Sequence, residues 1–192
     1  MKPAVLVLAG GQGQRMGGDK AMRRLGGRTL LDHAVERARR WSDEVAVAVR
    51  DKAQVGDPGI PLLIDPTGME GPLGGLASAL RLRRPMVLVI PCDTPFLPED
   101  MPERLQTALL DHDAALAASG GRVHPACGLW RTHSLDKLLD YAASGRRSLI
   151  GFAETIGYAT AEWPEGAFFN VNTPEDLAEA ETRLASAKRT EA

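Results

Sequence analysis

Apolar runs alternate along this chain with segments in which apolar residues recur at helical spacing. The runs at residues 4–8 and 86–90 contain no polar residue, which predicts strands buried on both faces. Other segments repeat apolar residues every three or four positions, as amphipathic helices do. The expected strands are residues 4–8, 44–49, 61–64, 86–90, 114–118, 124–130 and 167–172, and the expected helices are residues 29–41, 71–82, 99–111, 134–143, 148–153 and 173–187.

This alternation of strands and helices predicts an α/β protein with a mainly parallel, doubly wound sheet and helices on both faces. In the common strand order 3-2-1-4 the first and fourth strands are neighbours, and ligands bind beyond their carboxyl ends. No linker, repeat or low-complexity segment interrupts the pattern. We therefore expect a single domain over residues 1–188, followed by a polar tail at residues 189–192.

A glycine-rich stretch, residues 8–20, directly follows the first expected strand. Its glycines, Gly10 and Gly11 among them, let successive backbone N–H groups turn toward one anion, while Arg15 and Lys20 add positive charge. The P-loop pattern fails because Ala21 follows Lys20, and the dinucleotide pattern fails because Met16 occupies its last glycine position. We interpret the stretch as a phosphate-binding loop of another kind; the alternative is an ordinary surface loop.

Asp93 follows the fourth expected strand just as the glycine-rich stretch follows the first, so both should face one crevice. A carboxylate beside a phosphate site is explained by a divalent cation, commonly Mg2+, held by one or two carboxylates and by substrate phosphates. The alternative is that Asp93 forms a turn before Pro95. Its position at the expected switch point favours the metal-binding role, in a site suited to attack on a nucleoside triphosphate.

Further polar or glycine positions are candidates with structural alternatives of their own. Asp65 ends a strand and could approach a ribose or base, or it opens a turn. Gly74 lies in a segment that permits close ligand approach at a helix N-terminus, or merely starts that helix. Asn170 and Asn172 should share one face of a strand, or serve helix entry. His124 is either a substrate contact or a structural histidine, because an ionised phosphate nucleophile needs no general base.

Composition narrows the class of protein. The formal net charge of -2 and pI of about 6.1 give no bulk attraction to nucleic acid or to an anionic membrane. Two cysteines, Cys92 and Cys127, are too few for a disulfide framework and indicate a reducing compartment. The spacing of His124 and Cys127 suits metal ligands, but a structural zinc site wants four. With no run long enough for a signal peptide or a membrane span, we expect a soluble cytoplasmic protein.

A set of motifs spread over nearly the whole chain resembles the molybdenum cofactor guanylyltransferases of the MobA type. The first motif is shared by many nucleotidyltransferases, whereas the whole set in this order is specific. The motifs are Leu-Ala-Gly-Gly at 8–11, Arg-Met-Gly-Gly-Asp-Lys at 15–20, Gly-Pro-Leu-Gly-Gly at 71–75, Pro-Cys-Asp-Thr-Pro-Phe-Leu-Pro at 91–98, His-Pro at 124–125 and Asn-Val-Asn-Thr-Pro-Glu-Asp-Leu at 170–177.

The resemblance implies a Rossmann-like three-layer α/β/α sandwich that transfers GMP from GTP to the phosphate of molybdenum-molybdopterin, with release of pyrophosphate. It implies that Leu8, Ala9 and Gly10 bind the nucleotide, that Lys20 contacts it and that Asp65 lies at the nucleoside. Asp93 would hold Mg2+, and Asn170 and Asn172 would lie near the reacting groups. Molybdoenzyme-maturation proteins are candidate partners, and we expect a monomer that binds neither nucleic acid nor membrane.

One position departs from the family pattern, and rival functions remain. Where the family often has asparagine after the second strand, this chain has Val49-Arg50-Asp51, so whether Asp51 replaces that contact is open. Related cytidylyltransferases typically have Ala-Ala-Gly in place of residues 9–11 and Asp-x-Asp-Thr-Pro in place of residues 170–174. A sugar-phosphate nucleotidyltransferase would usually be longer. From other classes, the rivals are a dinucleotide-dependent oxidoreductase and a non-catalytic nucleotide-binding module.

Overall fold

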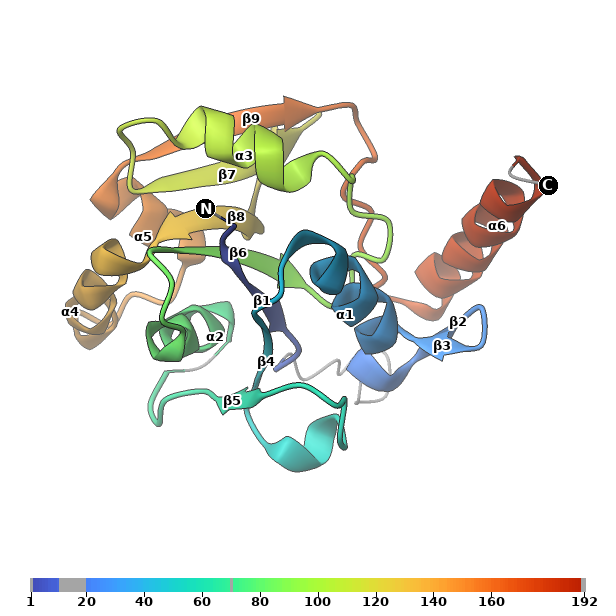
Figure 1. Cartoon of the computed structure of the whole chain (residues 1–192), viewed down its shortest axis with the longest axis horizontal. Helices are drawn as coiled ribbons and strands as arrows, with labels where there is room; N and C mark the ends of the chain where they lie inside the picture. Colours follow the sequence, from blue (N-terminus) through green and yellow to red (C-terminus); the bar gives the residue numbers. More distant parts are fainter. Residues whose placement is uncertain (1, 11–19, 70, 191–192) are drawn as a thin grey trace.

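The fold is built on one seven-stranded sheet with the strand order β5-β4-β1-β6-β8-β7-β9 (Figure 1). The computed structural model describes residues 2–10, 20–69 and 71–190. The sheet strands are β1 (Ala4–Leu8), β4 (Val45–Val49), β5 (Leu62–Ile64), β6 (Met86–Pro91), β7 (Ala114–Ser119), β8 (Arg122–Arg131) and β9 (Tyr158–Trp163). The helices are α1 (Leu30–Trp41), α2 (Pro72–Ser78), α3 (Met101–Leu109), α4 (Leu138–Ala143), α5 (Leu149–Ile156) and α6 (Pro174–Thr190).

The first part of the sheet has the expected doubly wound order. Strands β5, β4, β1 and β6 pair in parallel, and β1 lies between β4 and β6. Beyond β6 the pattern changes, since β8 pairs antiparallel with both β6 and β7, and β9 then pairs parallel with β7. The carboxyl ends of β1 and β6 meet at the switch point, where the Cys92 N–H donates to the Leu8 carbonyl over 3.1 Å.

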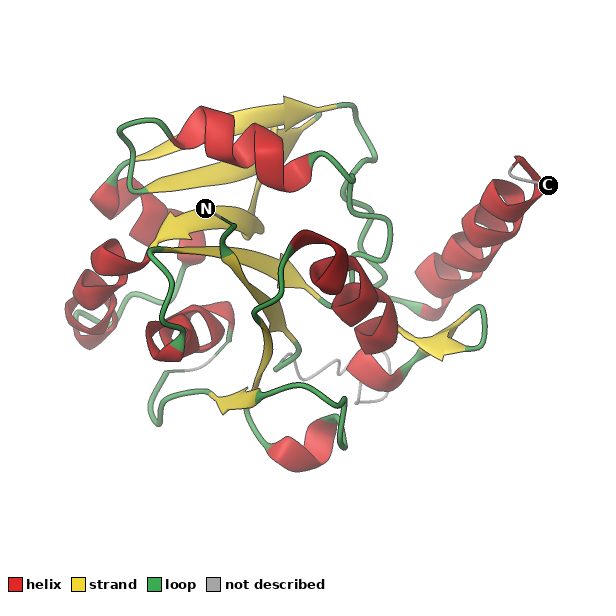
Figure 2. Ribbon diagram, viewed as in Figure 1, coloured by secondary structure: helices red, strands yellow, loops and turns green. Residues whose placement is uncertain are grey.

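Helices cover both faces of the sheet, which confirms the three-layer α/β/α class (Figure 2). Alternate residues of β1 divide between the faces, as the two-residue period of a strand requires. Val5 and Val7 pack in a core with α1 and α3, while Leu6 packs in a second core with α2, α4 and α5. The unbroken apolar strands of the sequence are therefore the ones buried on both sides.

A short hairpin and the last helix stand outside the three layers (Figure 1). Strands β2 (Arg24–Leu25) and β3 (Arg28–Thr29) form the hairpin, and α6 packs against it. Four buried residues hold them together, and we call this group the hairpin core. The hairpin core consists of Leu25, Leu30, Val171 and Ala180. It lies next to the segment that carries Lys20.

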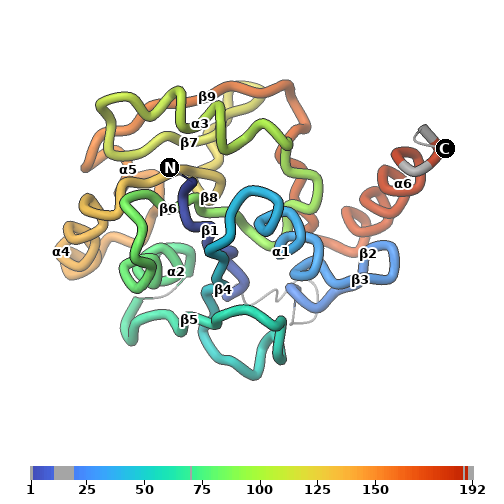
Figure 3. The backbone as a smooth tube through the Cα atoms, viewed as in Figure 1, coloured from blue at the N-terminus to red at the C-terminus, as the bar shows by residue number. Residues whose placement is uncertain are grey.

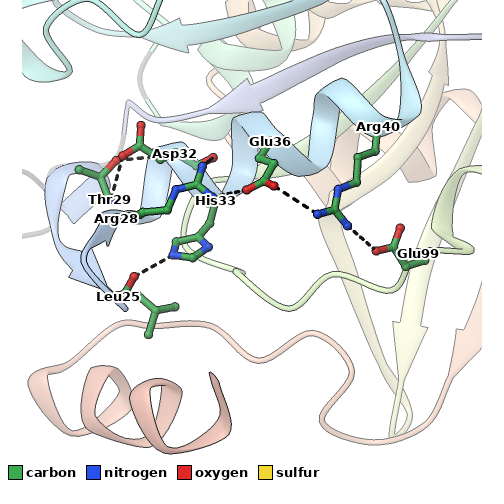
Figure 4. A network of polar contacts seen from close by, with 8 residues as sticks. All are labelled: Leu25, Arg28, Thr29, Asp32, His33, Glu36, Arg40 and Glu99. Carbon is green, nitrogen blue, oxygen red and sulfur yellow. Dashed lines mark hydrogen bonds and ion pairs between the residues drawn. The ribbon is translucent and has the colours of Figure 1, made fainter. Parts of the chain in front are cut away.

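Helix α1 begins with the expected capping box, in which Thr29 and Asp32 exchange side-chain and backbone hydrogen bonds. A polar network continues along the same helix (Figure 4). His33 Nε2 lies 2.8 Å from the Leu25 carbonyl, and Glu36 pairs with Arg28 of the hairpin. These contacts fasten the hairpin to α1.

After residue 150 one expected strand was wrong and one strand was missed. Residues 167–172, expected as a strand, are irregular: the Val171 N–H donates to the Asp93 carbonyl at 2.8 Å, outside any sheet ladder. The last strand is instead β9, whose pattern alternates only partly because it lies at the sheet edge. Figure 3 traces the connecting segment from β9 to α6.

Helix boundaries differ from the expected ones by a few residues. Helix α2 ends in a 3-10 turn at Ala79–Arg81, and the expected helix at 134–143 begins as a 3-10 helix, Thr132–Lys137, before α4. Helix α6 extends to Thr190, past the expected helix end at residue 187. Among the described helices, none has the length and apolar character needed to cross a bilayer.

Candidate functional site

A cavity of about 700 Å3 opens at the carboxyl ends of β1 and β6, at the predicted switch point. Its volume lies within the range of sites that bind a small-molecule ligand or cofactor. The structure brings most of the predicted site residues to its walls, although they lie far apart in the sequence. These are Leu8, Ala9, Gly10, Lys20, Asp65, Asp93, His124, Asn170 and Asn172.

Lys20 lies at the centre of a polar cluster. Its Nζ donates to Asp93 Oδ2 at 2.5 Å and to Asn172 Oδ1 at 2.6 Å. The Lys20 side chain is only 13% exposed and that of Asp93 21%, so solvent screens this ion pair weakly. The cluster thus holds a cation and a carboxylate together at the cavity wall.

The irregular segment before α6 is fixed to the segment that carries Asp93. The Val171 N–H donates to the Asp93 carbonyl, and the Thr94 hydroxyl contacts both Asn170 Oδ1 and Asp93 Oδ1. Neither asparagine is on a strand, so the predicted shared strand face is wrong. Both nevertheless line the cavity because these bonds hold their backbone against residues 93–94.

Asp65 lies on the other side of the cavity, close to the glycine-rich stretch. A Cβ on Gly10 would lie 3.1 Å from Asp65 Oδ2 and 3.2 Å from Arg50 Cγ, so only glycine fits there without displacing them. Burial raises the pKa of Asp65 to about 6, although Ser78, Arg50 and Arg81 act in the opposite direction. A partly buried carboxyl group with free acceptor capacity therefore faces the cavity.

The opposite wall of the cavity is formed by an irregular part of β8. Leu116 of β7 pairs with Gly128, but the next residue, Ala117, pairs with His124, so the ladder skips residues 125–127. Pro125 has no N–H to give to a ladder, which accounts for the irregularity. The bulge brings residues 123–127 to the cavity wall.

His124 is fixed within this wall. Its Nε2 lies 2.9 Å from Ser119 Oγ, and its ring packs on Phe168 with the centroids 4.8 Å apart. Burial, together with the nearby Arg122 guanidinium, lowers the pKa of His124 below its usual value. At neutral pH the imidazole is therefore uncharged, and it suits contact with a ring or hydroxyl better than it suits charge neutralisation.

The two cysteines also line the cavity, and both are buried. Burial, with the Asp93 charge as a smaller cause, raises the pKa of Cys92 to about 12 and also raises that of Cys127. A raised pKa disfavours the thiolate, the reactive form of a cysteine nucleophile. Among the described residues, no group of three or more His, Cys, Asp or Glu side chains could hold a metal ion.

Comparison with known proteins places this geometry in a family. Residues 5–156 match the family model described as MobA-like NTP transferase domain. The chain belongs to this family. A molybdenum cofactor guanylyltransferase from Cereibacter sphaeroides is 44% identical over 185 residues, which cover 93% of this chain and 95% of that protein. One from Rhodopseudomonas palustris is 41% identical over 194 residues, covering 93% and 91% of the two chains.

A solved structure supports the fold of the family member described here. The crystal structure of molybdopterin-guanine dinucleotide biosynthesis protein A from Archaeoglobus fulgidus superposes with a TM-score of 0.80. The match covers 95% of this chain and 99% of that chain at 24% sequence identity. At this identity the likeness shows the shared Rossmann-like architecture.

Some predicted site residues of this NTP transferase domain are placed differently from the expectation, or fall outside the described residues. Gly74 is not among the residues that line the cavity. It packs against the Met69 carbonyl, and a Cβ at Gly74 would collide with that oxygen. The neighbouring Gly71 and Gly75 line the cavity instead. Gly11 and Arg15 lie outside the described residues.

Asp51, the open candidate for the missing asparagine contact, has a local structural role. Its Oδ1 accepts from the Ala53 N–H at 2.9 Å and caps the 3-10 helix Lys52–Gln54. Asp51 is not among the cavity-lining residues, whereas the neighbouring Arg50 packs against Gly10.

Sequence reasoning missed two arginines on the far side of the cavity. Arg122, at the start of β8, and Arg147, before α5, both line it, as does Ser148, whose Oγ caps α5. Arg147 is fastened by a hydrogen bond from its guanidinium to the Ala142 carbonyl at 3.2 Å. The signal available in the sequence was a basic pair directly before a serine N-cap, which favours an anion-binding corner.

Proposed function

We propose that this protein transfers GMP from GTP to the terminal phosphate of molybdenum-molybdopterin and releases pyrophosphate. The observation that carries the proposal is the position of Lys20. It contacts Asp93 at the switch point and Asn172 on the segment before α6, between the wall with Gly10 and Asp65 and the wall with His124 and the two arginines. One cavity thus offers two binding sides with a cation between them.

The reaction is a displacement at the α-phosphorus of GTP. An oxygen of the acceptor phosphate forms a bond to that phosphorus, and the bond from the α-phosphorus to the bridging oxygen breaks, which releases pyrophosphate. The acceptor phosphate is ionised at neutral pH, so no side chain has to remove a proton. What the protein supplies is alignment of the two phosphates and stabilisation of the charge on their oxygens.

Lys20 is the side chain best placed for this task. Its ammonium group already has two oxygen acceptors at the cavity wall, and phosphate oxygens can replace one of them. Glycine at position 10 keeps the end of β1 close to Asp65 and Arg50, because a Cβ there would lie 3.1 Å from Asp65 Oδ2 and 3.2 Å from Arg50 Cγ, tighter than ordinary contact.

Mg2+ fits the donor set as a substrate-linked cofactor. Asp93 is the carboxylate at the reacting end, and phosphate oxygens and water would complete the coordination, which is the usual arrangement for Mg2+. When bound there, the ion would neutralise phosphate charge. One carboxylate is sufficient here, because substrate phosphates and water would supply the other ligands.

Asp65 supplies the preference for guanine. A carboxylate is an acceptor with two oxygens, and guanine presents the adjacent N1–H and N2 amino donors, whereas cytosine offers no such pair. Asp65 follows β5, which is separated from β1 by β4, and its side chain reaches Gly10 at the end of β1. We therefore place the base at Asp65 and the pterin against His124.

A nucleotide panel tests the proposal. The chain is supplied with loaded molybdopterin, Mg2+ and GTP, CTP, ATP or UTP, and released pyrophosphate is measured. We expect turnover with GTP and at least about 100-fold less with the others. Asp93→Ala should lose about 10^3-fold in kcat, since one stabilising group at the reacting phosphate is removed. Equal turnover of CTP would identify a cytidylyltransferase instead, and full activity of Asp93→Ala would overturn the assignment of Asp93.

We further propose that the chain acts as a cytoplasmic monomer and passes the finished dinucleotide cofactor to molybdoenzyme-maturation proteins. The low net charge of -2 gives no reason to expect nucleic acid or membrane as a partner. Sedimentation at micromolar concentration tests the oligomeric state, and a sedimentation coefficient of a dimer would contradict it.

A further inference from the structure

The start of α6 carries one more hydrogen bond than a helix cap requires. In a capping box the first residue and the fourth exchange side-chain and backbone hydrogen bonds. Thr173 and Asp176 form this box, with the Thr173 N–H donating to Asp176 Oδ2 at 2.9 Å and the Asp176 N–H donating to Thr173 Oγ1 at 3.1 Å. The same Asp176 oxygen also accepts from the Asn172 N–H, at 2.7 Å.

This additional bond leads directly to the reacting cluster. Asn172 accepts from Lys20 Nζ through its side chain while its backbone N–H is held by Asp176. The path therefore runs from Asp176 to Asn172, then to Lys20 and Asp93, through consecutive hydrogen bonds. Asn172 is an exposed residue outside any helix or strand, and hydrogen bonds hold both of its neighbours, Val171 to the Asp93 carbonyl and Thr173 to Asp176.

Helix α6 in turn is docked on the hairpin that follows the segment carrying Lys20. The hairpin core joins Leu25 and Leu30 to Val171 and to Ala180 of α6. At the hairpin turn the Gly26 N–H donates to Glu181 Oε1 at 2.8 Å. The hairpin is also fastened to α1 by the contacts of His33 and Arg28 (Figure 4). Helix α6 is thus fixed to the hairpin turn through Glu181 and to Asn172 through Asp176.

We propose that Asp176 is a positioning residue, which holds the Asn172 amide oxygen on Lys20 and so sets the direction of the lysine toward the reacting phosphate. The Glu181–Gly26 hydrogen bond fixes the helix from which Asp176 acts. This inference rests on the proposed function, because it is a statement about the geometry of the transfer step. Asp176 itself does not touch the substrates; it acts through Asn172.

A double-mutant cycle in the pyrophosphate assay tests the role of Asp176. Asp176→Ala should lower kcat about 10-fold, while KM for GTP changes less than about 2-fold, because the lost contact aligns rather than binds. In the Asn172→Ala background the same substitution should change kcat less than about 2-fold, since the residue through which it acts is gone. Asp176→Asn keeps an acceptor oxygen and should restore kcat to within about 3-fold of the unchanged chain.

Glu175→Ala is the matched control. It removes a carboxylate from the same helix turn, and the Glu175 side chain forms no hydrogen bond or ion pair among the described residues, so it reports only the effect of charge at the helix N-terminus. Its kcat should stay within about 2-fold of the unchanged chain. An equal loss of kcat from Asp176→Ala with and without Asn172, or a loss in Glu175→Ala of the same size, would show a purely structural cap and overturn the inference.

A second pair of variants tests α6 away from its cap. Glu181→Ala should lower kcat about 3-fold, whereas Glu179→Ala, whose side chain pairs with Arg183 on the same helix, should not. A Glu181→Ala protein with unchanged kcat would contradict the role of the Glu181–Gly26 hydrogen bond in fixing α6. If the unchanged chain releases no pyrophosphate with any nucleotide, the proposed function fails, and that outcome is distinct from failure of the Asp176 inference.

Discussion

The two sides of the cavity are built on different principles. The side that we propose for the nucleotide, called the nucleotide side below, comes from β5, β4, β1 and β6, parallel strands whose ends present backbone, glycine and the part-buried carboxyl of Asp65. The side that we propose for the acceptor, called the acceptor side below, comes from the bulged β8 and the start of α5, and it presents the side chains of His124, Arg122 and Arg147. Backbone recognition depends on fold alone, whereas side-chain recognition can change without disturbing the sheet. Substitutions on the nucleotide side should therefore be tolerated less well than substitutions on the acceptor side.

Lys20 belongs to both sides, so its removal should produce the largest effect. In Lys20→Ala the ammonium between Asp93 and Asn172 is lost, and with it the charge facing the phosphates. We expect kcat to fall about 10^3-fold, in the range found when one charge-stabilising group is removed from a transition state. Steady-state pyrophosphate release measures this, with thermal unfolding as the check that the fold is intact.

Lys52→Ala is a suitable control for Lys20→Ala. Lys52 is exposed, begins the 3-10 helix that follows β4, and is not among the residues lining the cavity. It should leave kcat unchanged within about 2-fold. A Lys20→Ala enzyme that retains more than a tenth of the activity would mean that the two sides are not joined through this lysine.

The nucleotide side was also the part that the sequence predicted best. Residues 4–8 and 86–90 have no polar interruption, so their burial on both faces and their parallel pairing follow from the pattern. Once β1 and β6 are neighbours, Asp93 and the end of β1 must reach the same edge of the sheet. The order of strands β5, β4, β1 and β6 confirms that these two strands are neighbours, and Gly10 and Asp93 both line the cavity.

The acceptor side depends on contacts that no local pattern encodes. Residues 167–172 have a strand-like composition, but Val171 and Asn170 form hydrogen bonds with residues 93–94, more than seventy positions earlier, and none of them joins a sheet ladder. Strand β9 lies at an edge, where burial gives only a weak alternation. Arg122 and Arg147 reach the cavity only because β8 bulges at Pro125 and because α5 starts at its wall. Tertiary pairing decided these positions, and propensity did not.

Asp65→Asn should produce the second largest effect and confine it to the nucleotide side. Replacing an acceptor oxygen by an NH2 donor leaves one guanine donor without a partner, which costs about 2 kcal/mol, or about 30-fold in KM for GTP. KM for molybdopterin should not change. Steady-state titration of each substrate at saturating levels of the other makes the measurement, and a parallel rise in both KM values would contradict the separation of the two sides.

The same substitution should alter stability in a pH-dependent way. The pKa of Asp65 is raised by burial to about 6, so the folded state binds the proton more tightly than the unfolded state does. That contribution to stability is present below the usual carboxyl pKa and is lost as the pH rises through about 6. Since the carboxyl is only partly buried, we expect Asp65→Asn to gain about 1 kcal/mol at pH 7.5, or about 2–4 °C in Tm.

Thermal unfolding at pH 4 and at pH 7.5 checks this expectation. The gain in Tm of Asp65→Asn over the unchanged chain should be clear at pH 7.5 and should largely disappear at pH 4, where the native carboxyl is protonated. A gain of equal size at both pH values would assign it to packing rather than to the charge of Asp65.

Arg147→Ala should have the smallest effect, and it acts on the acceptor side. Arg147 lines the cavity but is exposed to solvent, so the loss of its charge should raise KM for molybdopterin about 5-fold, while KM for GTP and kcat stay within about 2-fold. Arg146→Ala is the matched control, because the Arg146 guanidinium packs over the Tyr141 ring at 4.3 Å and does not line the cavity. If Arg147→Ala instead raised KM for GTP, the triphosphate would reach across the cavity to α5, and the division into a nucleotide side and an acceptor side would have to be redrawn at β8.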